Sequence, residues 1–356
     1  MQRPETSLSL FLAFLLAGCA ATNPSATSSP AADSATFDSD GTAHITRVVP
    51  MPATISPEAR KWLQSLEGSN AAPETLEIRR KRTDEWRAKQ SAEARRLFPV
   101  NVEETTIGGV RADIITPLET PSANRNRVLI NLHGGGFNSD SGSLIEGVPI
   151  ANLTKMKVVS VYYRLAPENP FPAAVNDVVG VYKELLKTHQ PRDIAIFGTS
   201  AGAILTAESA VRFQQLKLPM PAALGLFSVL VDYSHPSDSL QIFTLNGFPG
   251  ILQPQEPNKP IGDEYARDTN RRDPVLSPIF ADLHGMPSTL LVTSTRDLLL
   301  SDTARFHRAL LAANVDSQLV VYEALPHAFW YHFELPETTE ALHLMSHFFE
   351  TKLGHQ

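Results

Sequence analysis

Residues 194–205 place a serine where it can act as a nucleophile. The segment reads Ile-Ala-Ile-Phe-Gly-Thr-Ser200-Ala-Gly-Ala-Ile-Leu. The apolar run before the turn predicts a buried strand, and the residues after the turn predict a helix. A Gly-x-Ser-x-Gly turn lifts the serine Oγ clear of the backbone, because its small flanking residues let strand and helix approach closely. Ser200 is therefore a candidate nucleophile for attack on a carbonyl carbon.

Three consecutive glycines follow an earlier apolar run. Residues 129–136 read Leu-Ile-Asn-Leu-His-Gly-Gly-Gly. The backbone N–H groups of such a loop can bind an oxyanion, the charge that develops when a serine attacks an acyl carbon. A phosphate-binding loop is the alternative, but neither a Gly-Lys-Ser/Thr ending nor a Gly-x-Gly-x-x-Gly helix start is present. The loop is therefore a candidate oxyanion site.

A serine nucleophile also needs a base and a group that orients the base, and candidates for both come later in the chain. Asp297 and His327 each follow a predicted strand directly, at the sheet edge where sites of α/β proteins form. Asp302 is an alternative acid, but it lies one turn into the next helix, where its charge suits the helix N-terminus. His332 is an alternative base, but it lies beyond the turn, where packing or surface roles are commoner. We therefore expect Ser200, Asp297 and His327 to form a catalytic triad.

The elements that must position these residues alternate between strand and helix from residue 100 onward. The predicted strands are Val110–Thr116, Val128–Leu132, Val158–Tyr163, Ile194–Phe197, Leu224–Val229, Thr289–Thr293 and Gln318–Tyr322. The predicted helices are Ala173–Lys187, Ala201–Leu216, Ser301–Asn314 and Thr338–Lys352. Several of the strands are apolar on both faces, as buried parallel strands are. The alternation predicts an α/β fold with a mostly parallel, doubly wound sheet.

These motifs resemble the hormone-sensitive-lipase family of α/β-hydrolases, the bacterial family IV esterases. The resemblance covers about residues 55–350. It rests on His133-Gly-Gly-Gly136, Gly198-Thr-Ser-Ala-Gly202, Tyr163-Arg-Leu-Ala-Pro-Glu-Asn-Pro-Phe-Pro-Ala-Ala174, Asp273-Pro-Val-Leu-Ser-Pro278 and the loops of Asp297 and His327. Three positions depart from the common pattern and leave substrate preference open. Thr199 stands where many members have Asp, as in the GTSAG branch; Asn169 replaces a frequent His; and Asp297-Leu-Leu replaces Asp-Pro-Leu.

The resemblance implies an α/β-hydrolase fold with a helical cap from residues 54–98 and 233–275. It assigns the oxyanion donors to the backbone N–H groups of Gly135, Gly136 and Ala201, and it gives His133 a bracing role. The implied activity is serine carboxylester hydrolysis of short to medium acyl esters through an acyl-enzyme intermediate, with no cofactor and no metal. Many members pair through their last strand, so a homodimer is open here.

Two alternatives to this activity remain. A lactone hydrolase would use the same triad, because the same chemistry opens a ring ester. A non-catalytic ligand-binding protein can also use this scaffold, since fold alone does not imply function. Such proteins usually lack a triad member, most often the histidine, and this chain keeps all three.

The N-terminus predicts export and lipid attachment. The apolar run over residues 8–17 is too short to span a bilayer but suits the core of a secretory signal. It ends in Leu16-Ala-Gly-Cys19, which resembles the lipobox of bacterial lipoproteins, whose cysteine is lipid-modified and becomes the mature N-terminus. Residues 1–18 would then be the signal peptide, and Ala20 in place of Asp resembles sorting to the outer membrane. An ordinary secretion signal with an incidental cysteine is the alternative.

Residues 19–44 are rich in Ala, Ser, Thr and Pro, which predicts a disordered tether before a catalytic domain over 45–356. Cys19 is the only cysteine, which excludes a disulfide framework, a cysteine-rich zinc site and a cysteine nucleophile. The formal net charge of −7 argues against a nucleic-acid partner. Basic residues between 79 and 96 are interspersed with acidic ones, which predicts a solvated helix face, with contact to anionic lipid as the alternative.

Overall fold

The computed structural model describes residues 33–66, 75–140, 142, 144–244 and 262–353. It divides into two units, Met1–Pro50 and Met51–Gln356, which are described separately. The predicted signal peptide, Cys19 and the first part of the predicted tether lie outside the described residues.

An eight-stranded sheet forms the centre of the larger unit, with the strand order β10-β9-β8-β7-β5-β6-β4-β3. The strands are β3 (Val100–Ile107), β4 (Val110–Pro117), β5 (Val128–Leu132), β6 (Lys157–Val161), β7 (Ile194–Thr199), β8 (Ala223–Phe227), β9 (Ser288–Arg296) and β10 (Ser317–Pro326). The six strands from β10 to β6 are parallel, whereas β4 runs antiparallel to both β6 and β3. The expected α/β fold with a mostly parallel sheet is confirmed. β10 forms one edge of the sheet, the position from which two copies would pair through this strand. This pairing stays a prediction.

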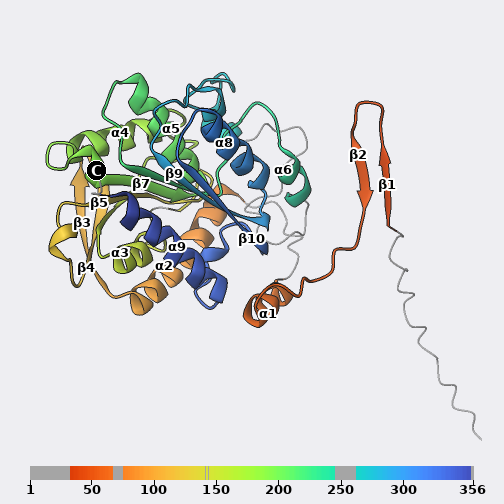
Figure 1. Cartoon of the computed structure of the whole chain (residues 1–356), viewed down its shortest axis with the longest axis horizontal. Helices are drawn as coiled ribbons and strands as arrows, with labels where there is room; N and C mark the ends of the chain where they lie inside the picture. The colour runs from red at the N-terminus through yellow and green to blue at the C-terminus, as the bar shows by residue number, and fades with distance from the viewer. Residues whose placement is uncertain (1–32, 67–74, 141, 143, 245–261, 354–356) are drawn as a thin grey trace, which may run out of the picture. The chain divides into compact units, whose positions relative to one another are not determined.

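Helices cover both faces of this sheet (Figure 1). One face carries α4 (Ala173–Leu185), α5 (Ala201–Gln215) and α8 (Leu300–Ala312), and the other carries α3 (Gly147–Thr154) and α9 (Pro336–Lys352). Further helices are α1 (Pro57–Ser65) and α2 (Leu76–Leu97), which contact α9 and α3, and α6 (Asp238–Phe243) and α7 (Asp263–Ala266), which lie between β8 and β9. The segments expected to form a cap therefore contain α1, α2, α6 and α7, although residues 245–261 are outside the described part.

The alternation of side chains along the strands explains why both faces are covered. In β7, Ile194 and Ile196 belong to one apolar core, whereas Ala195 and Phe197 belong to the other. Successive strand residues point to opposite faces, so a strand that is apolar throughout must be buried on both sides. The helices supply that burial.

Several elements differ from the sequence prediction. β3 was not predicted because it is a half-exposed edge strand whose apolar residues alternate with Asn, Glu and Thr. Helix α3 was not predicted either, since Gly147 and Pro149 obscure its helical pattern. The predicted strand Leu224–Val229 ends at Phe227, because Ser228 adopts a left-handed backbone conformation with φ of 57°.

The smaller unit is ordered over residues 33–44, the described part of the predicted tether, and so differs from the expected disorder there. Its strands β1 (Ser34–Phe37) and β2 (Ala43–Thr46) form an exposed antiparallel hairpin. The intervening turn is stabilised by the Asp38 N–H, which donates to the Thr42 carbonyl at 2.9 Å, and by the Thr42 N–H, which donates to the Asp40 carboxylate at 2.9 Å. The larger unit accordingly begins at Met51 rather than at residue 45.

Candidate active site

Ser200 lies at the sharp turn between β7 and α5. Its backbone has φ 58° and ψ −121°, a conformation that costs energy for any residue other than glycine. The neighbouring glycines make the turn feasible. A Cβ on Gly198 would lie 2.3 Å from the Leu132 carbonyl oxygen, and one on Gly202 would lie 1.7 Å from the same atom. Ser200 is thus held at the carboxyl ends of β5 and β7, as the sequence predicts.

Asp297 and His327 come together from the loops after β9 and β10. The His327 Nδ1 lies 2.9 Å from the Asp297 Oδ1, and the Asp297 side chain is fully buried. Asp297 also accepts hydrogen bonds from the Leu299 N–H at 2.8 Å, from the Thr293 hydroxyl at 3.1 Å and from the Ser228 hydroxyl. Burial alone would raise the pKa of Asp297, but the imidazole and these donors outweigh it and hold the pKa below its ordinary value. Asp297 is therefore a carboxylate that can orient a histidine.

The two alternative residues have other partners. Asp302 is buried in the first turn of α8, where its carboxylate lies 3.5 Å from the Arg305 guanidinium. The His332 ring packs on Trp62, with 4.3 Å between ring centroids, and its Nδ1 lies 3.6 Å from Glu334. These contacts give Asp302 an ion-pair role and His332 a packing role.

The glycine loop lies beside the serine turn. A Cβ on Gly134 would be 3.5 Å from the Ser200 Cβ, so the two backbones are in close contact. Gly135 and Gly136 have φ values of 116° and 63°, which favour glycine. Ala201 is the first residue of α5, where the backbone N–H points out of the helix end. Within the described part of the chain, the N–H groups of Gly135, Gly136 and Ala201 donate to no protein acceptor.

His133 is buried behind this loop. Its ring stacks on Tyr163 at 4.2 Å between centroids, and the Tyr163 hydroxyl donates to the His133 carbonyl at 2.7 Å. These contacts fit a bracing residue, because they fix both the ring and the backbone of His133.

Sequence reasoning missed several polar residues around the site. Ser228 and Thr293 bind the Asp297 carboxylate, while Glu146 and Tyr331 bind each other beneath the glycine loop. The one available signal was the position of Ser228 at the carboxyl end of a buried parallel strand, where site residues gather. Nothing in the local sequence of Glu146 marks it.

The basic helix α2 follows its prediction of a solvated face only in part. Lys81, Arg82, Lys89, Arg95 and Arg96 are exposed, as a solvated face requires. Arg80 instead points inward: its Nε donates to the Asn138 carbonyl at 2.7 Å, and its guanidinium forms two 2.7 Å hydrogen bonds with Glu168. Arg87 is buried and lies 3.3 Å from the Asp140 carboxylate. One face of α2 is therefore bound to the segments around the glycine loop.

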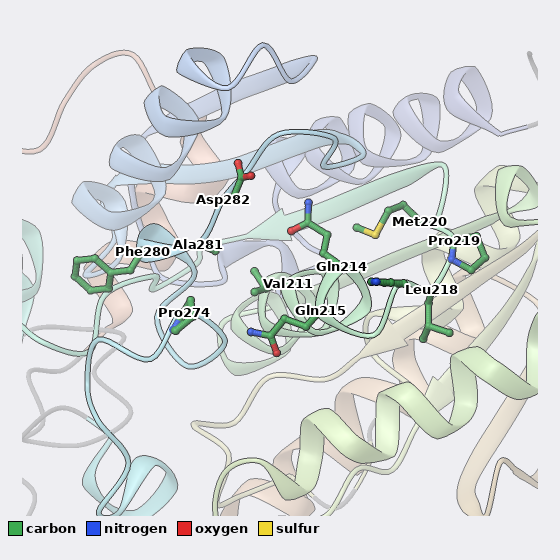
Figure 2. Close-up of a pocket in the computed structure, with 11 residues that line it drawn as sticks. Val211, Gln214, Gln215, Leu218, Pro219, Met220, Pro274, Phe280, Ala281 and Asp282 are labelled. Carbon is green, nitrogen blue, oxygen red and sulfur yellow. The ribbon is translucent and has the colours of Figure 1, made fainter.

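A groove of about 790 Å³ lies at the end of α5 remote from Ser200 (Figure 2). Its polar side chains are Gln214, Gln215, Lys217 and Asp282, and none of the predicted catalytic residues lines it. A helix of this length places its two ends about 20 Å apart. The groove is therefore separate from the candidate site.

Across the residues described, no group of three His, Cys, Asp or Glu side chains is arranged to hold a metal ion.

Comparison with known proteins gives the family. A sequence model of the alpha/beta hydrolase fold matches residues 129–331, a range that contains every residue of the candidate site. The chain belongs to the alpha/beta hydrolase fold family.

Relatives within the alpha/beta hydrolase fold family include esterases. The chain is 31% identical over 259 residues to an esterase of Acinetobacter venetianus, covering 69% of this chain and 82% of the relative. It is 29% identical over 256 residues to an acetyl-hydrolase of Streptomyces hygroscopicus, covering 70% and 82%. The solved structure of an esterase from the bacterial hormone-sensitive lipase family superposes with a TM-score of 0.72 at 27% identity, covering 84% of this chain and 99% of that one. This alpha/beta hydrolase is therefore a carboxylesterase-like enzyme similar to the hormone-sensitive-lipase esterases.

Proposed function

We propose that the protein hydrolyses carboxylic esters through an acyl-enzyme, with Ser200 as nucleophile, His327 as base and Asp297 as the orienting acid. The observation that carries the proposal is the 2.9 Å contact between His327 and the buried Asp297, whose other oxygen is held by two hydroxyl groups. A buried carboxylate that faces one imidazole nitrogen directs the other nitrogen to act as the acceptor.

In the proposed cycle, His327 takes the Ser200 proton as Oγ attacks the ester carbonyl. The N–H groups of Gly135, Gly136 and Ala201 hold the tetrahedral oxyanion. His327 then protonates the leaving alcohol, and water hydrolyses the acyl-enzyme by the same steps. Asp297 stabilises the imidazolium that forms in each half-reaction.

The proposed substrates are short to medium acyl esters. The acetyl-hydrolase among the relatives supports a small acyl group. The test is hydrolysis of p-nitrophenyl esters of increasing acyl length by the full-length chain. Turnover that peaks at short or medium chains would support the proposal and define the acyl pocket. No hydrolysis by a folded chain across the series would contradict it and direct attention to lactones and then to ligand binding.

Turnover should fall on acidification, because a histidine base must be neutral to accept the serine proton. Asp297, whose pKa is lowered, stays ionised over the same range. The lowered pKa also stabilises the fold above the unfolded aspartate pKa of about 3.9, and this contribution is lost as the pH falls through the folded value. The measurements are kcat/KM from pH 5 to 9 and thermal unfolding from about pH 2 to 9, which reaches the range where the Asp297 contribution is lost. A flat profile down to about pH 5 would count against His327 as base.

We also propose that Cys19 is lipidated and anchors the protein to the outer membrane. The support is the apolar run over 8–17 and the single cysteine at its end, which lie outside the described residues. In the described part, no helix is long and apolar enough to cross a membrane. If Cys19 carries the lipid, the full-length chain should sediment with membranes, and Cys19→Ala should release it. Membrane retention of Cys19→Ala would contradict lipid attachment at this residue.

A further inference from the structure

Glu146 is a buried carboxylate beneath the glycine loop. It directly precedes α3, and its side chain receives hydrogen bonds from three separate segments. Its Oε1 accepts from the Gly134 N–H at 3.1 Å and from the Tyr331 hydroxyl, and its Oε2 accepts from the Asn131 side-chain amide at 3.2 Å. Glu146 therefore joins the end of β5, the glycine loop and the segment that follows His327.

The Gly134 N–H is the last amide before the two proposed oxyanion donors of the loop. The Gly135 carbonyl, which shares a peptide unit with the Gly136 N–H, accepts from the Ser139 N–H at 3.1 Å and from the Ser139 hydroxyl at 2.8 Å. The loop is thus anchored at the Gly134 N–H, before both donors, and at the peptide unit that carries the Gly136 donor. Since oxyanion donors act through preorganisation, an anchor one peptide away sets where they point.

The buried Arg87 of α2, which lies 3.3 Å from the Asp140 carboxylate, also favours the ionised form of Glu146 electrostatically. Burial raises the pKa of Glu146, and the Arg87 guanidinium, the Tyr331 hydroxyl and the Gly134 N–H oppose that rise. The Arg87 Cζ lies 4.4 Å from the centre of the Tyr331 ring, so the cation packs against the same side chain that donates to Glu146. A buried carboxylate is costly unless it is hydrogen-bonded, and Glu146 accepts three hydrogen bonds.

We propose that Glu146, held by Tyr331, is a positioning residue that fixes the oxyanion loop for catalysis. This inference rests on the proposed function, because it requires an oxyanion at Ser200. Glu146 touches none of the three triad residues among its described contacts, so it acts through the Gly134 peptide.

The test compares Glu146→Leu, Glu146→Gln and Tyr331→Phe in the full-length chain. Leucine removes every acceptor, and we expect kcat to fall about 10²- to 10³-fold with KM changed little, as for loss of an oxyanion donor. Glutamine keeps an acceptor for the Gly134 N–H, so its kcat should stay within about tenfold of the parent. Phenylalanine removes one donor to Glu146 and keeps the ring, and kcat should fall about three- to tenfold.

The affinity for a trifluoromethyl ketone inhibitor distinguishes positioning of the oxyanion loop from a purely structural role of Glu146. Ser200 Oγ adds to the carbonyl carbon of the ketone while the serine proton passes to His327, leaving a hemiketal oxyanion in the loop. In the Glu146 and Tyr331 variants, affinity for the ketone should fall in parallel with kcat/KM, whereas affinity for the matching secondary alcohol should not change.

Asp302→Asn is the matched control, because it alters another buried carboxylate with no described contact to the loop. Its kcat and inhibitor affinities should match those of the parent.

Parent-like kcat and ketone affinity in folded Glu146→Leu would overturn the inference. If that variant does not fold, parent-like values in Tyr331→Phe would overturn it instead. Failure of the Glu146 inference can be distinguished from failure of the proposed function. An inactive parent, or an active Ser200→Ala, would remove the function itself, whereas an active parent and inactive Ser200→Ala leave only the role of Glu146 in question.

Discussion

Replacing Ser200 by alanine is expected to lower kcat by about 10⁶-fold, since the substitution removes the atom that forms the acyl-enzyme. The oxyanion loop and the substrate site stay in place, so a small residual rate above that of water remains. The fold should be retained. Alanine and serine meet a similar backbone cost at φ 58°, and the glycines that pack against β5 are unchanged. Steady-state hydrolysis of the preferred p-nitrophenyl ester, with thermal unfolding, measures both effects.

Ser209→Ala is the matched control for this loss. Ser209 is a buried serine within α5, and its hydroxyl makes no hydrogen bond in the described structure. Its replacement should leave kcat within about twofold, because no site contact is lost. If Ser200→Ala kept more than about one per cent of parental turnover while fully folded, hydrolysis would not proceed through this serine.

Asp297→Asn is expected to lower kcat by about 10³- to 10⁴-fold. The Leu299 N–H is a fixed donor to Oδ1, so it favours the amide oxygen at that position, where it still accepts from His327. The Ser228 and Thr293 hydroxyls can rotate to accept from the amide nitrogen. Most of the loss of kcat should therefore come from removing the negative charge that stabilises the His327 imidazolium. If the His327 tautomer also reverses, kcat should fall by the full ~10⁴-fold. Turnover and the nitrogen NMR signals of His327 distinguish the two causes.

Asp302→Asn is the matched comparison for the acid. Asp302 pairs with Arg305 and makes no described contact with His327, so this variant should lose stability rather than turnover. Near-parental turnover in Asp297→Asn, together with a large loss in Asp302→Asn, would transfer the acid role to Asp302.

The positions of the proposed triad could be predicted because each residue lies next to a strong local pattern. Ser200 sits in a Gly-x-Ser-x-Gly turn, and Asp297 and His327 follow apolar runs that read as strands. The parallel sheet then brings the loop ends together, and the structure places His327 against Asp297. Local patterns suffice here because the carboxyl ends of parallel strands all lie at one edge.

The contacts that hold the site could not be predicted in the same way. Glu146 and Tyr331 are 185 residues apart, and Arg87 meets them from a helix that reads as a solvated, highly charged segment. Such pairs depend on how helices dock onto the sheet, which periodicity does not specify. The hairpin over residues 34–46 was missed for another reason. Its backbone hydrogen bonds and turn, rather than large apolar side chains, give it structure.

The strand order has a consequence for biosynthesis. The proposed nucleophile and acid follow β7 and β9, whereas the proposed base follows β10, which pairs only with β9 at the sheet edge. During synthesis the proposed base therefore follows the proposed nucleophile and acid, and a chain that has not reached residue 327 lacks the group proposed to activate Ser200. Under the proposed mechanism, hydrolytic activity can begin only when β10 has joined the sheet. For a protein whose N-terminus predicts export, the docking of β10 would then mark the onset of catalysis.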